Sequence, residues 1–177
     1  MTAMHRCALL ACMGFALAGL AAPVALPPPV RIVFNPSDSV ARGWYLVDAL
    51  NGASSLRGTL RAGSIVLARL PAGVAAFAAQ RGYLPQGVPI LKRVGAVAPQ
   101  AVCALDRLVW IDGVPVAAAL TRDGAHRPLQ PWPYCRALVD GELCLLSDTN
   151  PASFDSRYFG PIDAVAVLGI ARPMWTW

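Results

Sequence analysis

Hydroxyl groups and a single amine are the side chains of this sequence best suited to chemistry. Ser37 and Ser39 stand two residues apart in the stretch NPSDSVARGWYLV, and Lys92 lies in PILKRVGAV. Lysine occurs only at this position, although the chain has 15 Lys and Arg residues in all. Apolar neighbours favour the neutral amine because burial penalises its charged form. A neutral amine can take the proton of a serine hydroxyl, so these residues could perform serine–lysine nucleophilic catalysis.

The same residues also have ordinary structural interpretations. Lys92 could be a solvent-facing residue of a strand, and Ser37 and Ser39 could be turn residues whose hydroxyls bond to nearby backbone groups. A Ser-His-Asp triad would depend on His126 alone, since the other histidine lies in the apolar N-terminal region. Histidine and cysteine ligands are too few and wrongly spaced for a metal site. We expect neither a metal nor a cofactor.

Composition limits the classes to which the protein can belong. A length of 177 residues predicts one domain with an appendage. Hydrophobic residues make up 56% and charged residues 14%, which argues against disorder and is compatible with membrane association. The net charge of +5 is spread over single arginines without any basic block. We therefore expect no nucleic acid among the partners.

An uncharged apolar run, residues 7–26, follows Arg6 near the N-terminus. Its length matches the roughly 20 residues that cross a bilayer, and the preceding positive charge predicts a cytoplasmic N-terminus. We predict a single-pass inner-membrane protein whose residues 1–29 form an anchor and spacer and whose residues 30–177 form a periplasmic domain in contact with lipid. Small residues in GLAAPVAL leave a cleaved signal peptide as the alternative, which would make the mature protein periplasmic.

Periodicity and turn residues predict a mainly β fold with one or two short helices. Strands are predicted at 30–34, 43–47, 63–70, 89–97, 141–148 and 162–175, and a helix at 71–82. Residues 101–120 are predicted to form a hairpin with Asp112-Gly113 as its turn. Residues 123–138 and 149–161 are predicted to be loops because they are rich in turn-forming residues.

Three cysteines lie in the predicted periplasmic domain. In an oxidising compartment a disulfide among Cys103, Cys135 and Cys144 is expected. We predict the pair Cys103–Cys135, because this bond would close a long loop held by few other elements. Cys144 alternates with apolar neighbours and is predicted to be a buried free thiol.

Three segments, taken in order, resemble the TraF-type conjugative-transfer peptidases, which are relatives of signal peptidase I. NPSDSVARGWY resembles the nucleophile segment, LKRV the base segment and SFDSRYFGP the third shared block, and HRPLQPW resembles the stretch before that block. The resemblance covers nearly the whole chain, including the apolar N-terminal run. Ala41 departs from the family pattern, which usually has proline there, and this would leave the loop less rigid.

The resemblance implies a signal peptidase I-like β-fold and a role for each matching residue. Ser39 matches the nucleophile and Lys92 its general base. Ser37 matches a hydroxyl that helps to form the oxyanion hole, where such donors contribute roughly 3 kcal/mol. Ser153 matches a serine that orients the lysine amine.

Asp155 matches the third functional residue of the family, and Arg157 its charge partner. Both could equally form a structural ion pair that holds a loop. The implied activity is that of a serine endopeptidase that cleaves membrane-tethered precursors, such as a pilin propeptide or a signal peptide, through an acyl-enzyme. Whether water or an amine resolves that intermediate does not follow from the sequence.

Two other functions compete with this interpretation. A non-enzymatic, anchored periplasmic component of a transfer or secretion channel would leave Ser39 and Lys92 apart in space. A self-cleaving serine–lysine regulator would need a DNA-binding segment, whereas residues 1–29 are apolar.

Overall fold

The computed structural model describes residues 10–17, 30–50, 60–147 and 149–177. The chain divides into two compact units, Met1–Val30 and Arg31–Trp177. In the first unit, residues 10–17 are helical and exposed. Within the described ranges, no helix has both the length and the apolar character needed to cross a membrane. The remainder of the predicted anchor, residues 7–9 and 18–26, lies outside the described residues.

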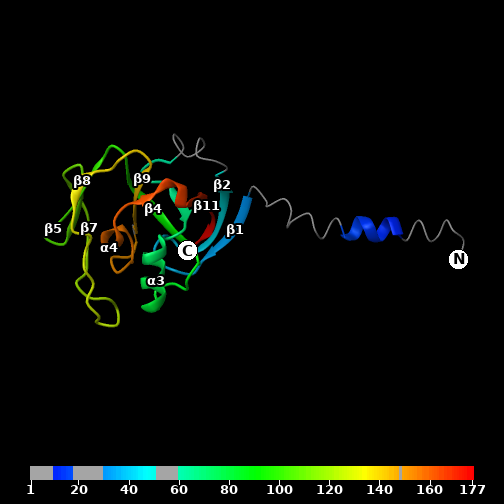
Figure 1. Cartoon of the computed structure of the whole chain (residues 1–177), viewed down its shortest axis with the longest axis horizontal. Helices are drawn as coiled ribbons and strands as arrows, with labels where there is room; N and C mark the ends of the chain where they lie inside the picture. The colour runs from blue at the N-terminus through cyan, green and yellow to red at the C-terminus, as the bar shows by residue number, and fades with distance from the viewer. Residues whose placement is uncertain (1–9, 18–29, 51–59, 148) are drawn as a thin grey trace, which may run out of the picture. The chain divides into compact units, whose positions relative to one another are not determined.

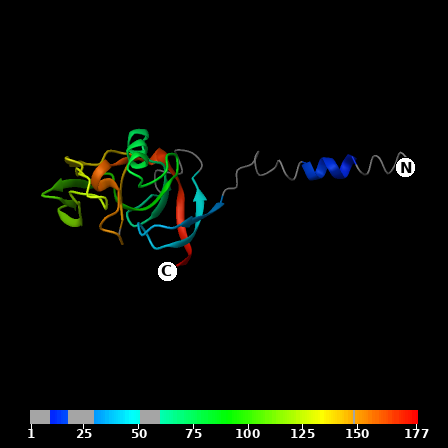
Figure 2. The ribbon, with the colours of Figure 1, turned by 90° about the horizontal axis from the view of Figure 1, so that it is seen from below.

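Antiparallel strands build the second unit. In the described part of the chain they form a seven-stranded sheet in the order β1-β2-β11-β3-β4-β9-β10 and a four-stranded sheet in the order β7-β6-β5-β8. The larger sheet contains β1 (Val30–Asn35), β2 (Gly43–Ala49), β3 (Ile65–Ala68), β4 (Ile90–Val97), β9 (Glu142–Leu146), β10 (Ile162–Asp163) and β11 (Val167–Thr176). The smaller contains β5 (Ala101–Leu105), β6 (Leu108–Ile111), β7 (Val114–Ala118) and β8 (Cys135–Ala137). Figures 1 and 2 show β1, β2 and β11 grouped on one side of the domain and the smaller sheet on the other. The predicted mainly β class is confirmed.

Two short helices and one 3-10 turn complete the domain in the described residues. α3 (Ala72–Gln80) begins directly after Pro71, whose fixed φ suits a helix start, as the sequence predicts. α4 (Ser156–Phe159) forms inside the segment predicted to be a loop. Asp155 makes this helix possible, because its carboxylate accepts the N–H of Arg157 at the helix start. The 3-10 turn, Ala164–Ala166, joins β10 to β11.

The smaller sheet has more strands than the sequence predicts. The predicted turn at Asp112-Gly113 joins β6 to β7, but a second turn at Asp106-Arg107 joins β5 to β6. Both residues of this second turn have positive φ, 50° and 66°. This combination belongs to tight hairpin turns, in which Gly or Asn is usual. The turn contains no glycine, so its residue types do not indicate it.

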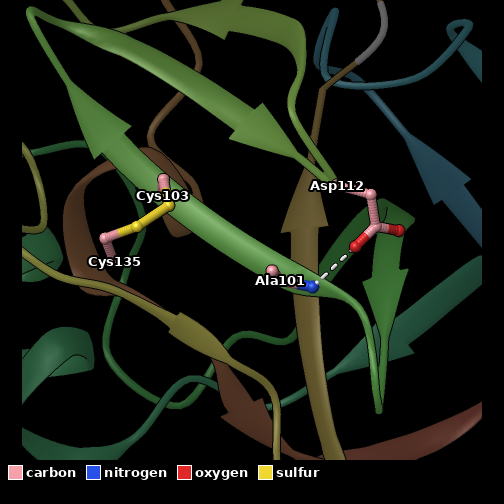
Figure 3. Close-up of a disulfide and its surroundings, with 4 residues drawn as sticks. All are labelled: Ala101, Cys103, Asp112 and Cys135. Carbon is pink, nitrogen blue, oxygen red and sulfur yellow. Dashed lines mark hydrogen bonds between the residues drawn. A yellow bond between two sulfur atoms is a disulfide. The ribbon is translucent and has the colours of Figure 1, made fainter.

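A disulfide joins Cys103 to Cys135 across neighbouring strands of the smaller sheet (Figure 3). The two residues are opposite each other in the β5–β8 register. The strand β8 therefore forms within a segment predicted to be a loop. Cys144 is buried and free, and burial raises the pKa of its thiol to about 12. A thiol that stays protonated at neutral pH is unreactive.

Close packing requires glycine at one position in each of two segments that carry the family resemblance, NPSDSVARGWY and SFDSRYFGP. Gly43 has φ +139°, and a Cβ at this residue would lie 2.1 Å from the carbonyl oxygen of Trp175 on β11. Gly160 has φ +76°, and a Cβ there would lie 2.5 Å from Nε1 of Trp132. Any side chain at either position would therefore both clash and force an unfavourable backbone conformation. The contact between Gly160 and Trp132 holds the segments HRPLQPW and SFDSRYFGP side by side.

Removal of the disulfide should destabilise the domain. The bond links residues 32 positions apart, and closing a loop of that length is worth about 3–4 kcal/mol in the chain-entropy account. The double variant Cys103→Ala/Cys135→Ala should lose free energy of unfolding of this order in urea denaturation. Reductant should lower the stability of the wild type and leave the variant unchanged. Non-reducing peptide mapping that links Cys144 to either residue would contradict the pairing.

Candidate active site

Lys92 is the third residue of β4 and is only 3% exposed. It pairs in register with Val66 of β3. Its amine Nζ donates a hydrogen bond of 2.7 Å to Oγ of Ser39 and a second, very short one to Oγ of Ser153. Ser39 lies between β1 and β2, and Ser153 lies just before α4. The fold thus brings together three residues that are far apart in the sequence.

The surroundings of Lys92 change its acid–base behaviour. Burial lowers the pKa of its amine to about 8, because a charged ammonium loses its water there. The negative charge of Asp155 acts in the opposite direction, and the positive charge of Arg157 adds to the lowering. A substantial fraction of the amine is therefore neutral slightly above neutral pH. Such an amine can accept a proton from the serine hydroxyl that it contacts.

The turn that carries Ser39 is held from inside by Asn35, the last residue of β1. Asn35 is only 4% exposed. Its amide Nδ2 lies 2.9 Å from the carbonyl oxygen of Ser37 and 3.1 Å from those of Val40 and Ala41. Its Oδ1 accepts the N–H of Ser37 at 3.2 Å. Sequence reasoning missed Asn35, although an Asn-Pro pair at the end of an apolar strand is a recognised turn signal.

Ser37 lies close to both the turn and the candidate nucleophile. Its hydroxyl lies within donating distance of two oxygens, 2.9 Å from Oδ1 of Asn35 and 3.2 Å from Oγ of Ser39. A hydroxyl has one hydrogen, so it can serve only one acceptor at a time. The group can therefore turn toward a third acceptor, such as a substrate oxygen beside Ser39.

Asp155 and Arg157 form a buried ion pair. Nε of Arg157 donates to Oδ1 of Asp155 at 2.8 Å, and its NH2 donates to Oδ2 at 2.8 Å. The exposed fractions are 0% for Asp155 and 2% for Arg157. The guanidinium also donates to four carbonyl oxygens, those of Ala118, Asn150, Pro151 and Ser153. Every charge of this pair is satisfied, and the pair holds the segment that carries Ser153.

Ser147 connects the ion pair to the turn that carries Ser39. Its N–H donates to Oδ2 of Asp155 at 2.9 Å, and its hydroxyl donates to the carbonyl oxygen of Ser39 at 2.8 Å. Among the described residues, no hydrogen bond joins Asp155 directly to Ser39 or Lys92. These contacts favour a role for Asp155 in holding the site rather than in proton transfer. Ser147 was not predicted, because it acts on a main-chain carbonyl and a serine after a strand has no distinctive pattern.

The remaining predicted residues do not join this site. Cys103 and Cys135 belong to the smaller sheet. His126 lies in a turn closed by its N–H bond to the carbonyl oxygen of Asp123. The described residues contain no group of three or more His, Cys, Asp or Glu side chains that could hold a metal ion. The reactive groups at this site are therefore a hydroxyl, an amine of lowered pKa and hydrogen-bond donors.

Comparison with known families agrees with this geometry. The sequence model of the family described as "Signal peptidase, peptidase S26" matches residues 4–177. The chain belongs to the peptidase S26 family. The match covers nearly the whole chain, and the resemblance to signal peptidase relatives stated from the sequence is confirmed.

Individual relatives carry names from conjugation. The chain is 39% identical over 108 residues to a probable conjugal transfer protein TraF of Sinorhizobium fredii, covering 56% of each protein. It is 36% identical over 114 residues to a plasmid transfer protein TraF of Escherichia coli, covering 59% of this chain and 64% of the relative. The chain thus matches less than two thirds of the length of these relatives. A crystal structure of signal peptidase I from Enterococcus faecalis V583 covers 63% of this chain and 96% of its own, with 22% identity and a TM-score of 0.38.

Burial of Lys92 should cost stability in a pH-dependent way. A pKa of about 8 in the folded state, against about 10.4 in the unfolded chain, corresponds to about 3 kcal/mol lost at neutral pH. Below pH 8 both states are protonated and the folded state carries the full penalty. Between pH 8 and 10.4 the unfolded chain binds more protons, so the stability contributed by this group rises with pH. The stability advantage of Lys92→Met over wild type should therefore shrink by about 3 kcal/mol between pH 7 and pH 10.5 in urea denaturation. A difference independent of pH would contradict the lowered pKa.

Asp155→Asn should lower the stability of the fold more than it lowers the rate of cleavage. The substitution leaves the buried guanidinium of Arg157 without its countercharge, which typically costs about 3–5 kcal/mol. In the fraction that remains folded, turnover should fall less than in Ser39→Ala, because Asp155 does not contact the reacting groups. Denaturation curves and cleavage rates normalised to folded protein would test both parts. Complete loss of turnover in a fully folded Asp155→Asn protein would instead indicate direct participation.

Proposed function

We propose that the protein is a membrane-anchored serine endopeptidase in which Ser39 is the nucleophile and Lys92 the general base. The observation that carries this proposal is the buried Lys92 amine, 2.7 Å from Oγ of Ser39 and hydrogen-bonded to Ser153. A non-enzymatic channel component would have no reason to bury its only lysine against two serine hydroxyls. That alternative predicted the two residues to be apart, and they are in contact.

Acylation begins with proton transfer within this cluster. The neutral amine of Lys92 uses its lone pair to accept the proton of the Ser39 hydroxyl, while its own N–H donates to Ser153 and fixes its direction. Oγ of Ser39 then attacks the scissile carbonyl carbon and forms a tetrahedral intermediate. The negative oxygen of that intermediate receives hydrogen bonds from Ser37 and from the Ser39 N–H.

Collapse of the intermediate breaks the peptide bond and leaves an acyl-enzyme on Ser39. The ammonium of Lys92 returns its proton to the leaving amine, so the base is neutral again for the second step. It then accepts a proton from water, or from an amine, as that group attacks the ester. Hydrolysis gives a new carboxylate, whereas attack by an amine gives a new peptide bond. Ser39 regains its proton in both cases.

The names of the relatives and the apolar N-terminal run support a proposal for the substrate class. We propose that the protein cleaves exported precursors that are tethered to the membrane, namely a pilin propeptide or a signal peptide with small residues before the cut, during conjugative transfer. The TraF names of the relatives support the setting. Enzyme and substrate held at one membrane surface meet more often than they would in free solution.

Cleavage should depend on the protonation of Lys92. Since only the neutral amine can act as a base, the rate should rise with pH through an apparent pKa of about 8. The measurement is cleavage of a membrane-bound pilin or signal-peptide precursor by the full chain in detergent between pH 6 and 10. Lys92→Arg should be inactive over this range, because a guanidinium is not deprotonated there. Lys92→His should be nearly inactive, because the imidazole is too short to reach Ser39.

Folding of these variants is checked by circular dichroism, with Ser39→Ala as the reference for complete loss. A folded Lys92→Arg protein that cleaves near the wild-type rate would end the serine–lysine interpretation. Lys92→Arg is a stringent control, since Arg preserves the positive charge and removes only the ability to lose a proton.

We also propose that residues 7–26 anchor the protein in the inner membrane with the domain in the periplasm. Exposed aromatic side chains on β1, β2 and β11 support a position beside lipid. Phe34, Trp44 and Trp175 are 44%, 43% and 73% exposed, and tryptophan favours the membrane–water interface. A reporter fused after residue 177 should be active only if it works outside the cytoplasm. Activity of a strictly cytoplasmic reporter at that position would contradict this topology.

A further inference from the structure

Every main-chain carbonyl from residue 37 to residue 41, across the turn that carries Ser39, accepts a hydrogen bond from a side chain. The two N–H groups of the Asn35 amide lie within hydrogen-bond distance of the carbonyls of residues 37, 40 and 41 and are shared among these three acceptors. Thr149 donates its hydroxyl to the carbonyl of residue 38, and Ser147 donates to that of residue 39. The hydroxyl of Tyr45 adds a bond of 2.6 Å to the carbonyl of residue 41. We call these four donors, Asn35, Tyr45, Ser147 and Thr149, the carbonyl clamp.

The hydrogen bond from Thr149 acts on the peptide unit that joins Asp38 to Ser39. The carbonyl of Asp38 and the N–H of Ser39 belong to one planar trans unit, so they point in opposite directions. When Thr149 holds this carbonyl, it also fixes the direction of the N–H. Among the described residues, no acceptor takes the N–H of Ser39. This donor is thus held in a fixed direction and is free to bind a ligand oxygen next to Oγ of Ser39.

We propose that Thr149 and Ser147 are positioning residues that pre-organise the Ser39 N–H as an oxyanion donor, with Asn35 holding the rest of the turn. The proposal rests on the peptidase function proposed above. Turns whose carbonyls are tied back leave their N–H groups free on the other side, which is the arrangement of anion-binding main-chain sites. A hydrogen-bond donor stabilises the transition state best when its orientation is fixed before the reaction begins.

Residues that precede α4 orient both the oxyanion donor, the N–H of Ser39, and the general base, the amine of Lys92. Ser147 and Thr149 donate their hydroxyls to the turn that carries Ser39, and Ser153 places its hydroxyl against the amine of Lys92. Arg157 holds the residues that follow Thr149, since it donates to the carbonyls of Asn150, Pro151 and Ser153. The groups that orient the oxyanion donor and the general base therefore lie close together in the sequence, just before α4.

Thr149→Val tests this directly, because it removes the hydroxyl and keeps the shape of the side chain. An interaction realised only in the transition state lowers kcat and leaves KM nearly unchanged. With a precursor peptide bearing alanine at the first and third positions before the cut, kcat of the full chain in detergent should fall about tenfold, less than loss of a whole oxyanion donor. The apparent pKa of the pH–rate profile should stay at the wild-type value. Thr149→Ser should restore kcat.

A transition-state analogue separates positioning from a general loss of folded enzyme. A peptide aldehyde ending in alaninal forms a hemiacetal with Ser39 whose oxygen occupies the oxyanion position. Its affinity for Thr149→Val should fall by the same factor as kcat/KM. A merely structural defect would lower the active fraction and leave the affinity of the active fraction unchanged. Thr121→Val, an exposed threonine in the loop between β7 and β8, is the matched control and should alter neither quantity.

Ser147→Ala is the second variant and should lower kcat and aldehyde affinity in parallel. Wild-type cleavage that is lost in Ser39→Ala, together with unchanged kcat and aldehyde affinity in both Thr149→Val and Ser147→Ala, would overturn the clamp and leave the peptidase function standing. Absence of both wild-type cleavage and aldehyde binding would overturn the peptidase function, and the clamp with it. A shifted pH profile in Thr149→Val would also overturn the proposal, since it would assign the effect to Lys92.

Discussion

A lysine amine buried in the middle of a sheet is the constraint on which the rest of the structure depends. The group is costly to charge and costly to leave without partners, so it must be partly neutral and hydrogen-bonded. Its two hydroxyl partners, Ser39 and Ser153, come from segments on either side of β4 in the sequence. The sheet around it must supply enough apolar burial to offset an unfavourable residue at its centre. Under the proposed function, catalysis and stability are therefore opposed at this position, as is common in catalytic sites.

The second buried charged group, the guanidinium of Arg157, is stabilised in a different way. Lys92 reduces its cost by losing its proton more easily, whereas the guanidinium of Arg157 stays charged and is fully paired. Its bond to the carbonyl of Ala118 reaches the end of β7 in the smaller sheet. The smaller sheet thus supports the segment that aims the amine, although it contributes no side chain to the Lys92 cluster.

Local periodicity was enough to predict helix α3 and the strands of the larger sheet, except that β10 and β11 were expected as one strand. The meeting of Ser39 and Ser153 with Lys92 was expected from the family resemblance of the segments that carry them. The turn at Asp106-Arg107 escaped prediction because tertiary pairing imposes positive φ on residues that do not favour it. Asn35, Ser147 and Thr149 escaped because each acts on the backbone of a distant or neighbouring segment. Which carbonyl a common polar side chain will reach is decided by the fold, and its sequence context carries little sign of that choice.

The position of β11 has a consequence for when Ser39 and Lys92 can first meet. In the larger sheet β11 lies between β2 and β3, so the strands flanking the Ser39 turn join the strand of Lys92 only through it (Figure 1). β11 comes last among the strands in the sequence. Pairings between segments so far apart form late, because the loop between them must first be closed. A chain whose last strand is not yet paired would hold Ser39 and Lys92 on separate, incomplete pieces of sheet. Under the proposed function, cleavage would then require the complete domain.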